Sequence, residues 1–139
     1  MTLRQITLVA AAAAAFSTSA ARAEGCAQVE VQNVRPDHGM LMVAAYGGAA
    51  DYKKKPAASM QVRPSAATLR FSVCGLGGPA VALSMYQDLN SNGKLDANLL
   101  GIPSEPWGAT GKPSNFAAPS WDSTQVALDG SVLVVKLSQ

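Results

Sequence analysis

TLRFSVCGLGGPAVALSMY, residues 68–86, is the stretch that decides the fold, because it holds two short runs of alternating apolar residues. Apolar side chains recur at every second position of these runs: Leu69, Phe71 and Val73, then Val81, Leu83 and Met85. A period of two places them on one face of a β-strand. The segment 75–79 between the runs is rich in Gly and Pro and is typical of a turn. The stretch therefore predicts two antiparallel strands that share one core.

Similar short runs occupy most of the chain after residue 24, at 27–34, 40–46, 125–128 and 132–137. Segments rich in Gly, Pro and Asn separate them, and helical periodicity is hard to find. The pattern predicts an all-β sandwich with five or six strands. Asp129-Gly130 is a strong hairpin signal, so we expect the last two runs to pair with each other. We expect a long crossover loop over 46–60, whose three consecutive lysines are solvated.

The N-terminus has the three parts of a secretory signal peptide: a basic start, an uncharged run over 6–16, and small residues ending at Ala23. A bilayer-spanning helix needs roughly 20 apolar residues, so we expect cleavage after Ala23 and no transmembrane segment in the mature protein. Residues 24–139 then form a single β-sandwich domain, periplasmic or secreted. Lipid attachment at Cys26 is the alternative, but Glu24 does not fit such a site.

Charge and cysteine content limit the function further. Cleavage would remove two of the 11 basic residues, which leaves the mature chain formally neutral against its 9 acidic residues. A neutral domain lacks the basic surface that nucleic-acid binding requires. In an oxidising compartment Cys26 and Cys74 are expected to form a disulfide. A metal or catalytic thiol is the competing interpretation, but the only histidine is His38.

The segment DLNSNGKLD, residues 88–96, is the clearest candidate for an ion-binding site. The oxygen-bearing side chains of Asp88, Asn90 and Asn92 fall at alternate positions. Gly93 then provides a residue that can adopt a positive φ. This arrangement is typical of calcium loops, and Asp96, at the ninth position, is a fourth candidate ligand.

Two observations leave the calcium interpretation open. The twelfth position, where an EF-hand loop has a bidentate Glu, is Leu99, and spacing alone does not establish whether Glu105 folds back to replace it. The alternative is a tight turn in which the Asp and Asn side chains cap their own backbone. Asp88→Ala separates the two interpretations, because it should abolish a calcium-dependent rise in melting temperature only if Asp88 is a metal ligand.

The sequence contains no recognisable catalytic constellation, since it lacks a Gly-x-Ser-x-Gly motif. The stretch 88–120 is long and irregular, and it holds Trp107 and Phe116. Together with Trp121 these aromatic residues suggest either a ligand platform or a plug at the open end of the sandwich. We take Glu105 and Trp107 as the candidate ligand surface.

The segment YQDLNSNGKLDANLLGIPSEPWG, residues 86–108, resembles the exported bacterial family catalogued as domain of unknown function 2141. The resemblance includes the DxNxNGxLD loop, the GxPxE segment and the aromatic-glycine pair, and it extends more weakly over the mature chain. It implies an immunoglobulin-like or transthyretin-like sandwich of about seven strands, without an established activity. The chain departs from the family at Gln87, where the family often has His, and at 108–111.

Two hypotheses about function follow. The first is a non-catalytic binding or interaction module with a calcium loop at 88–96, whose partner is an envelope component or a small ligand. The second is a cell-envelope hydrolase that uses Asp88, Asp96 and Glu105 as acid and base. Carboxylates that line a concave pocket with Trp107 would favour the enzyme. Convergence of the loop oxygens without an adjacent cleft would favour the binding module.

Overall fold

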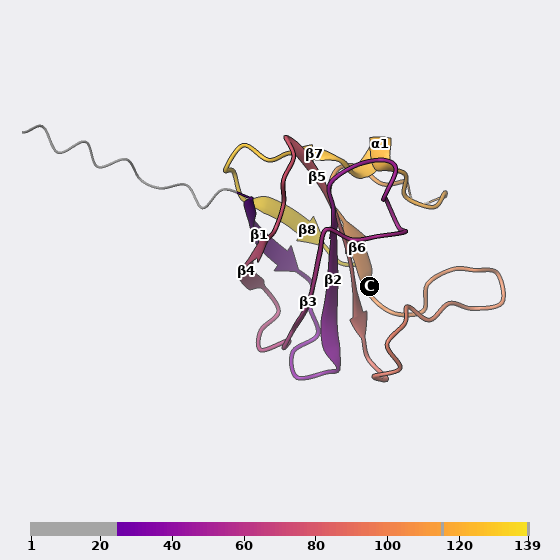
Figure 1. Ribbon diagram of the computed structural model, residues 1–139. Coiled ribbons are helices and arrows are strands. Elements are labelled where there is room, and N and C mark those ends of the chain that lie inside the picture. Colours follow the sequence, from indigo (N-terminus) through magenta and orange to yellow (C-terminus); the bar gives the residue numbers. More distant parts are fainter. Residues whose placement is uncertain (1–24, 115, 139) are drawn as a thin grey trace, which may run out of the picture.

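A computed structural model describes residues 25–114 and 116–138, and within them the chain is an all-β sandwich of two sheets (Figure 1). The elements are β1 (Cys26–Gln32), β2 (Met40–Tyr46), β3 (Ala58–Val62), β4 (Leu69–Cys74), β5 (Ala80–Asp88), β6 (Trp107–Ala109), α1 (Trp121–Thr124), β7 (Val126–Ala127) and β8 (Leu133–Lys136). The smaller sheet has the order β4-β1-β8. The larger has the order β3-β2-β5-β6, with β7 also paired to β5. The predicted all-β sandwich is confirmed.

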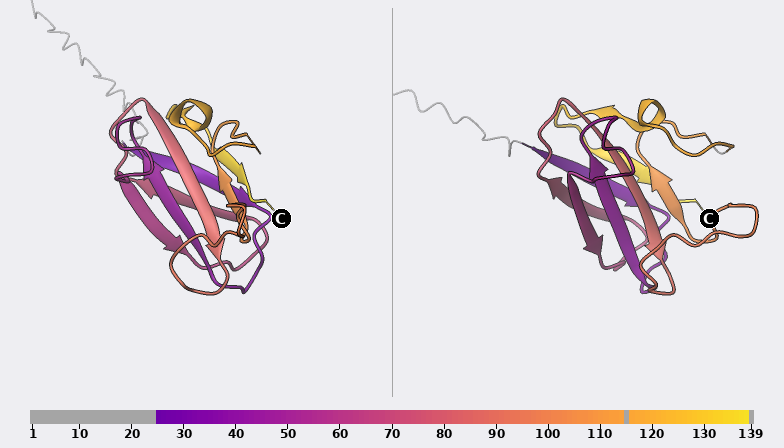
Figure 2. Two further views of the ribbon diagram at one scale, coloured as in Figure 1. Left: turned by 90° about the vertical axis from the view of Figure 1, so that its right-hand side faces the viewer. Right: turned by 45° about the vertical axis from the view of Figure 1, so that its right-hand side comes forward.

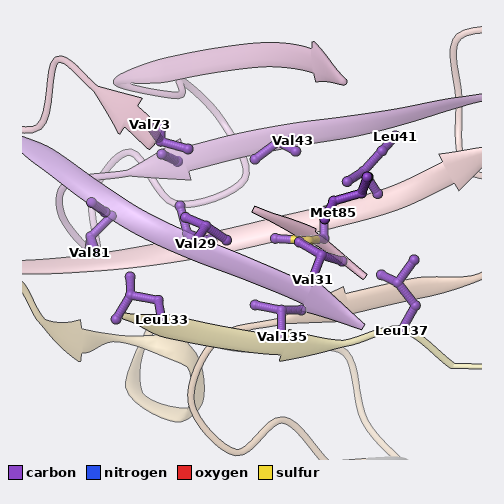
Figure 3. Packing of buried hydrophobic residues seen from close by; sticks show 14 of the residues in the cluster. Val29, Val31, Leu41, Val43, Val73, Val81, Met85, Leu133, Val135 and Leu137 are labelled. Atoms are coloured by element: carbon purple, nitrogen blue, oxygen red, sulfur yellow. The ribbon is translucent and has the colours of Figure 1, made fainter. Parts of the chain in front are cut away.

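The core lies between the two sheets and is made by alternate residues of their strands (Figure 3). In β5 the inward-facing Val81, Leu83 and Met85 are buried. In β4 Leu69 and Val73 are buried, and Phe71 packs partly buried against the same cluster. The prediction that these two runs share one core is therefore confirmed. Burial of a large aliphatic side chain is worth about 1.5–3 kcal/mol, so this alternation accounts for much of the drive to fold.

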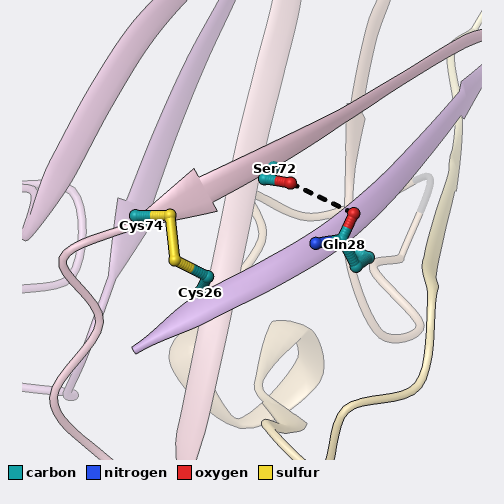
Figure 4. Close-up of a disulfide and its surroundings, with 4 residues drawn as sticks. All are labelled: Cys26, Gln28, Ser72 and Cys74. Atoms are coloured by element: carbon teal, nitrogen blue, oxygen red, sulfur yellow. Dashed lines mark hydrogen bonds between the residues drawn. A yellow bond between two sulfur atoms is a disulfide. The ribbon is translucent and has the colours of Figure 1, made fainter. Parts of the chain in front are cut away.

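The predicted disulfide is confirmed and joins Cys26 to Cys74 (Figure 4). The two cysteines face each other where β1 begins and β4 ends, in the register of the antiparallel pair. Two residues further in, the Ser72 hydroxyl donates to Gln28 Oε1 at 3.1 Å. Closing a loop with a sequence separation of 48 stabilises the fold by about 4 kcal/mol on the chain-entropy model.

The predicted C-terminal hairpin is wrong. Strand β7 pairs antiparallel with β5 of the larger sheet, whereas β8 pairs in parallel with β1 of the smaller sheet. The turn at Asp129-Gly130 forms, because Gly130 has a φ of 88° and Ser131 N–H donates to Asp129 Oδ1 at 2.9 Å. The chain that leaves this turn crosses from one sheet to the other, since each strand finds its apolar partners in a different sheet. The smaller sheet is consequently mixed.

Two further elements differ from the sequence prediction. The expected crossover loop over 46–60 ends in strand β3, which pairs with β2. Helix α1, which the sequence did not predict, is a single turn with Ser120 as its N-cap and a capping box completed by Ser123. None of the described helices is long and apolar enough to cross a membrane. The predicted signal peptide, residues 1–23, lies outside the described residues.

Candidate functional site

The candidate site is built on the loop that leaves β5 and returns as β6, residues 89–106. Figures 1 and 2 show this loop projecting from the side of the sandwich. Its outer part folds back on itself, with a bridge between Ala97 and Pro103. Asn98 N–H donates to Ile102 O at 2.9 Å, and Gly101 N–H donates to Asn98 O at 2.9 Å. The tip is therefore a hydrogen-bonded turn.

Asp88 holds the first part of the loop. Its side chain is buried at 3% exposure. Oδ1 accepts a hydrogen bond from the backbone N–H of Asn92 at 3.1 Å, and Oδ2 accepts one from Gly93 N–H at 2.8 Å. Gly93 has a φ of 78°, which a glycine adopts without strain. Asp88 therefore acts as a cap for the turn, as the structural alternative to a metal ligand predicts.

Glu105 closes the loop from its other end. It is 6% exposed, and its two oxygens accept hydrogen bonds from Leu89 N–H at 2.9 Å and Asp96 N–H at 3.1 Å. The spacing in the sequence did not reveal where this side chain goes. The structure shows that Glu105 folds back onto backbone amides at two points along the loop. Because charged acceptors make strong hydrogen bonds, these contacts fix the shape of the loop base.

The other candidate calcium ligands gather beside this base. Asn92 Nδ2 lies 2.8 Å from both oxygens of Asp96, and Asn90 Nδ2 also donates to Asp96. The hydrogen bonds from Asn92, followed by those from Asn90, lower the pKa of Asp96. Asn90 Oδ1 accepts from Asn92 N–H at 3.3 Å. Side chains from Asp88, Asn90, Asn92 and Asp96 therefore lie in one local network.

Among the described residues, no three or more Asp, Glu, His or Cys side chains are grouped so as to hold a metal ion. A calcium shell built from residues 88–96 would thus rely on the amide oxygens of Asn90 and Asn92 as well as on carboxylates. Such a mixed oxygen set suits a hard cation.

The three loop carboxylates do not line a common cleft. The groove beside Trp107 is about 440 Å³ and is lined mainly by apolar loop residues, and Asp88, Asp96 and Glu105 are absent from its lining. Asp88 and Glu105 each already accept two backbone N–H groups. Of the two candidate ligand-surface residues, Trp107 lies in the groove and Glu105 is buried below the loop.

Comparison with known proteins identifies the family. Residues 29–136 match the family model described as an uncharacterized protein conserved in bacteria, DUF2141. The chain belongs to this family. The match covers the sandwich from β1 to β8 together with the 89–106 loop. No curated protein and no solved structure matches the chain.

The aromatic residues of this DUF2141 protein lie in two separate places. Trp121 packs edge-to-face on Tyr52 with ring centroids 6.1 Å apart. Phe116 is 99% exposed, and Trp107 is half-buried on β6. Phe116 and Trp107 both line the groove, with Leu100 and Ile102. Trp107 and Phe116 therefore share one groove, whereas Trp121 packs on Tyr52 and is absent from the lining of that groove.

Gln87 is a structural residue whose contacts the sequence did not reveal. It is fully buried, and its side chain accepts from Arg35 N–H at 2.9 Å and donates to Arg35 O at 2.7 Å and His38 O at 2.6 Å. It therefore ties the turn 35–39 to the end of β5, next to the loop base. The signal in the sequence was a polar residue at an inward-facing position of a buried strand.

Proposed function

We propose that this DUF2141 protein is an exported, non-catalytic binding module whose recognition surface is the outer part of the 89–106 loop and the adjoining groove. The observation that carries the proposal is the exposure of the apolar tip: Leu99 is 106% exposed, Leu100 83% and Ile102 56%. A concentration of exposed apolar side chains on one element is typical of an interaction surface.

The base of the loop supports the same proposal. Asp88 and Glu105 together accept four backbone hydrogen bonds, which hold the loop in one shape before any partner binds. A preorganised loop loses less conformational entropy on binding than a flexible one. The hydrolase alternative has less support, because its acid and base would be side chains already committed to the backbone and absent from the groove.

Location outside the cytoplasm is part of the proposal. The Cys26–Cys74 disulfide and the signal-like sequence of residues 1–23 support it. Intact-mass measurement of protein from the periplasm or medium should give a chain that starts at Glu24 and is two hydrogens lighter than the reduced form. A mass that includes an acyl chain on Cys26 would contradict this.

Binding at the tip can be tested with an apolar fluorescent dye such as anilinonaphthalene sulfonate. The folded protein should enhance dye emission, and Leu100→Ser with Ile102→Ser should remove most of the enhancement without lowering the melting temperature. The matched control is Val132→Ser with Val134→Ser, because these residues are 54% and 55% exposed but lie near and on β8. Equal losses in the two double variants would show that the loop is not a specific surface.

Calcium binding at residues 88–96 is a finer part of the proposal. Its support is the local network that contains Asp88, Asn90, Asn92 and Asp96, together with the alternate spacing of their oxygens. Each carboxylate oxygen of Asp88 accepts one backbone N–H and has a second lone pair. Capping the turn and contacting a cation are therefore compatible roles for this residue.

Melting in millimolar calcium and in chelator tests this part. A ligand at 100 times its Kd stabilises the native state by about 2.7 kcal/mol, so calcium should raise the melting temperature of the wild type. Asp88→Ala should abolish that rise. Gly93→Ala is the control, because it strains a positive φ and should destabilise the protein equally in both conditions. An unchanged wild-type melting temperature would refute calcium binding and leave the binding-module proposal intact.

A further inference from the structure

The groove beside the loop tip has a composition that selects for a particular ligand. It lies between the 89–106 loop and the segment that follows β6, and both project from the same side of the sandwich (Figure 2). Trp107 and Ser84 contribute from β6 and β5, and Leu100, Ile102 and Phe116 contribute from the two loops. Its volume of about 440 Å³ is within the range of small-molecule sites.

Lys53 carries the single formal charge among the described residues that line this groove. Its Nζ lies 5.5 Å from the ring centroid of Tyr52, within the distance of a cation–π contact. Tyr52 in turn packs edge-to-face on Tyr46, at 5.2 Å, and on Trp121. Lys53 is exposed, but the protein atoms beside it remove part of the hydration of its ammonium group and so lower its pKa. An anion beside it would replace part of the lost hydration.

We propose that the groove binds one molecule of a fatty-acid-like amphiphile, with its apolar tail against Leu100, Ile102 and Trp107 and its carboxylate at Lys53. The inference rests on the proposed function and specifies the ligand class of that surface. The groove supplies a mainly apolar lining and one cationic position, which matches a tail with one anionic end.

Two other partners fit these observations less well. Membrane surfaces are recognised by clusters of about 4 to 8 basic residues, whereas this lining has one, and the surface here is concave. An extended peptide requires hydrogen bonds for its backbone, commonly from an open strand edge. The edge strand here, β6, is already contacted by Ser138, whose N–H donates to Trp107 O at 2.8 Å. The composition of the groove therefore favours an amphiphile.

Tryptophan fluorescence gives a direct readout, because the chain has 2 tryptophans and Trp121, which packs on Tyr52, is absent from the lining of the groove. Trp121→Phe leaves Trp107 as the sole reporter. Dodecanoate, titrated below its micellar concentration, should shift the Trp107 emission to shorter wavelength in a saturable way. Calorimetry on the protein with both tryptophans should give the same Kd.

Variants then separate the tail from the carboxylate. Leu100→Asp places a charge on an exposed side chain, so the fold is preserved, and it should weaken dodecanoate binding at least about tenfold. Lys53→Gln should weaken it about threefold, as expected for an exposed ion pair, and leave binding of neutral dodecanol unchanged. Lys54→Gln is the matched control, because Lys54 is exposed and outside the lining, and it should have no effect.

Three results would overturn the inference: no saturable response to dodecanoate, equal affinity of the wild type for dodecanoate and dodecanol, or binding to phosphatidylglycerol vesicles without binding to monomeric dodecanoate. These results are distinguishable from failure of the proposed function. If the tip binds the apolar dye but the groove does not bind dodecanoate, the binding-module proposal stands and only the proposed ligand class is refuted.

Discussion

The base and the tip of the 89–106 loop have opposite chemistry. At the base, the carboxylates of Asp88 and Glu105 are 3% and 6% exposed, whereas at the tip Leu99 is fully exposed. This inverts the usual distribution, in which charged groups face water and large aliphatic groups are buried. The carboxylates are buried because backbone N–H groups satisfy them. The two buried carboxylates therefore give the loop its shape, and its apolar residues are the ones exposed to solvent.

The largest expected loss of stability comes from Gly39→Ala, which adds a methyl group against the base of the loop. Gly39 has a φ of 58°, and a Cβ there would overlap the Asp88 carbonyl and the Leu89 backbone. Gly39→Ala should cost about 3 kcal/mol or more, because neither backbone can yield without moving the loop. A Cβ at Gly93 would meet no other atom, so Gly93→Ala should lower the free energy of unfolding only through the strain of the positive φ, by about 1–2 kcal/mol. Urea unfolding measures both, and equal losses would show that the base is not tightly packed.

Glu105→Ala should have the next largest effect. It leaves the N–H groups of Leu89 and Asp96 without their acceptor, at a cost of about 2–3 kcal/mol in the free energy of unfolding. Glu105→Gln keeps one acceptor oxygen and should lose less. Hydrogen exchange should accelerate at these two amides in the alanine variant. Unchanged exchange would contradict the role of Glu105 as the acceptor for these two amides.

A smaller effect is expected at Asp96, whose pKa is lowered mainly by the Asn92 side chain. Asn92→Ala should raise this pKa towards its ordinary value, as measured by NMR titration, and Asn90→Ala should raise it less. Because folding lowers this pKa, the stability that Asp96 contributes is present above its unfolded pKa and is lost as the pH falls through its folded pKa. Asn92→Ala should therefore reduce the amount of stability that the protein loses through Asp96 as the pH falls.

The smallest effect on stability is expected at the tip. Leu99→Ser exchanges a fully exposed side chain, so the free energy of unfolding should stay within about 0.5 kcal/mol of the wild type. Denaturation in guanidinium measures it. A loss of 2 kcal/mol, comparable to that at the base, would show that the tip is packed in solution and would remove the distinction between the two parts of the loop.

The sequence predicted where the strands lie better than it predicted which strands pair with each other. Alternation located the strands that contain Leu69 and Val81, because a period of two directly reports a half-buried strand. It did not reveal that β7 and β8 pair with different sheets, since a local turn signal says nothing of the strands on either side. The loop at 88–96 was found from its oxygen spacing. The contacts of Glu105 were not, because a link between distant amides depends on the folded loop.

The parallel pairing of β1 with β8 has a consequence for the order of events during synthesis. β1 is the first of the described strands to leave the ribosome and β8 is the last, yet β1 is the middle strand of the smaller sheet. Until β8 emerges, one edge of β1 has no strand beside it, and Val135 and Leu137 are missing from the core. Pairings between such distant segments form slowly. The smaller sheet can therefore be completed only when translation of the described strands has ended, so the fold has to form after synthesis and not during it.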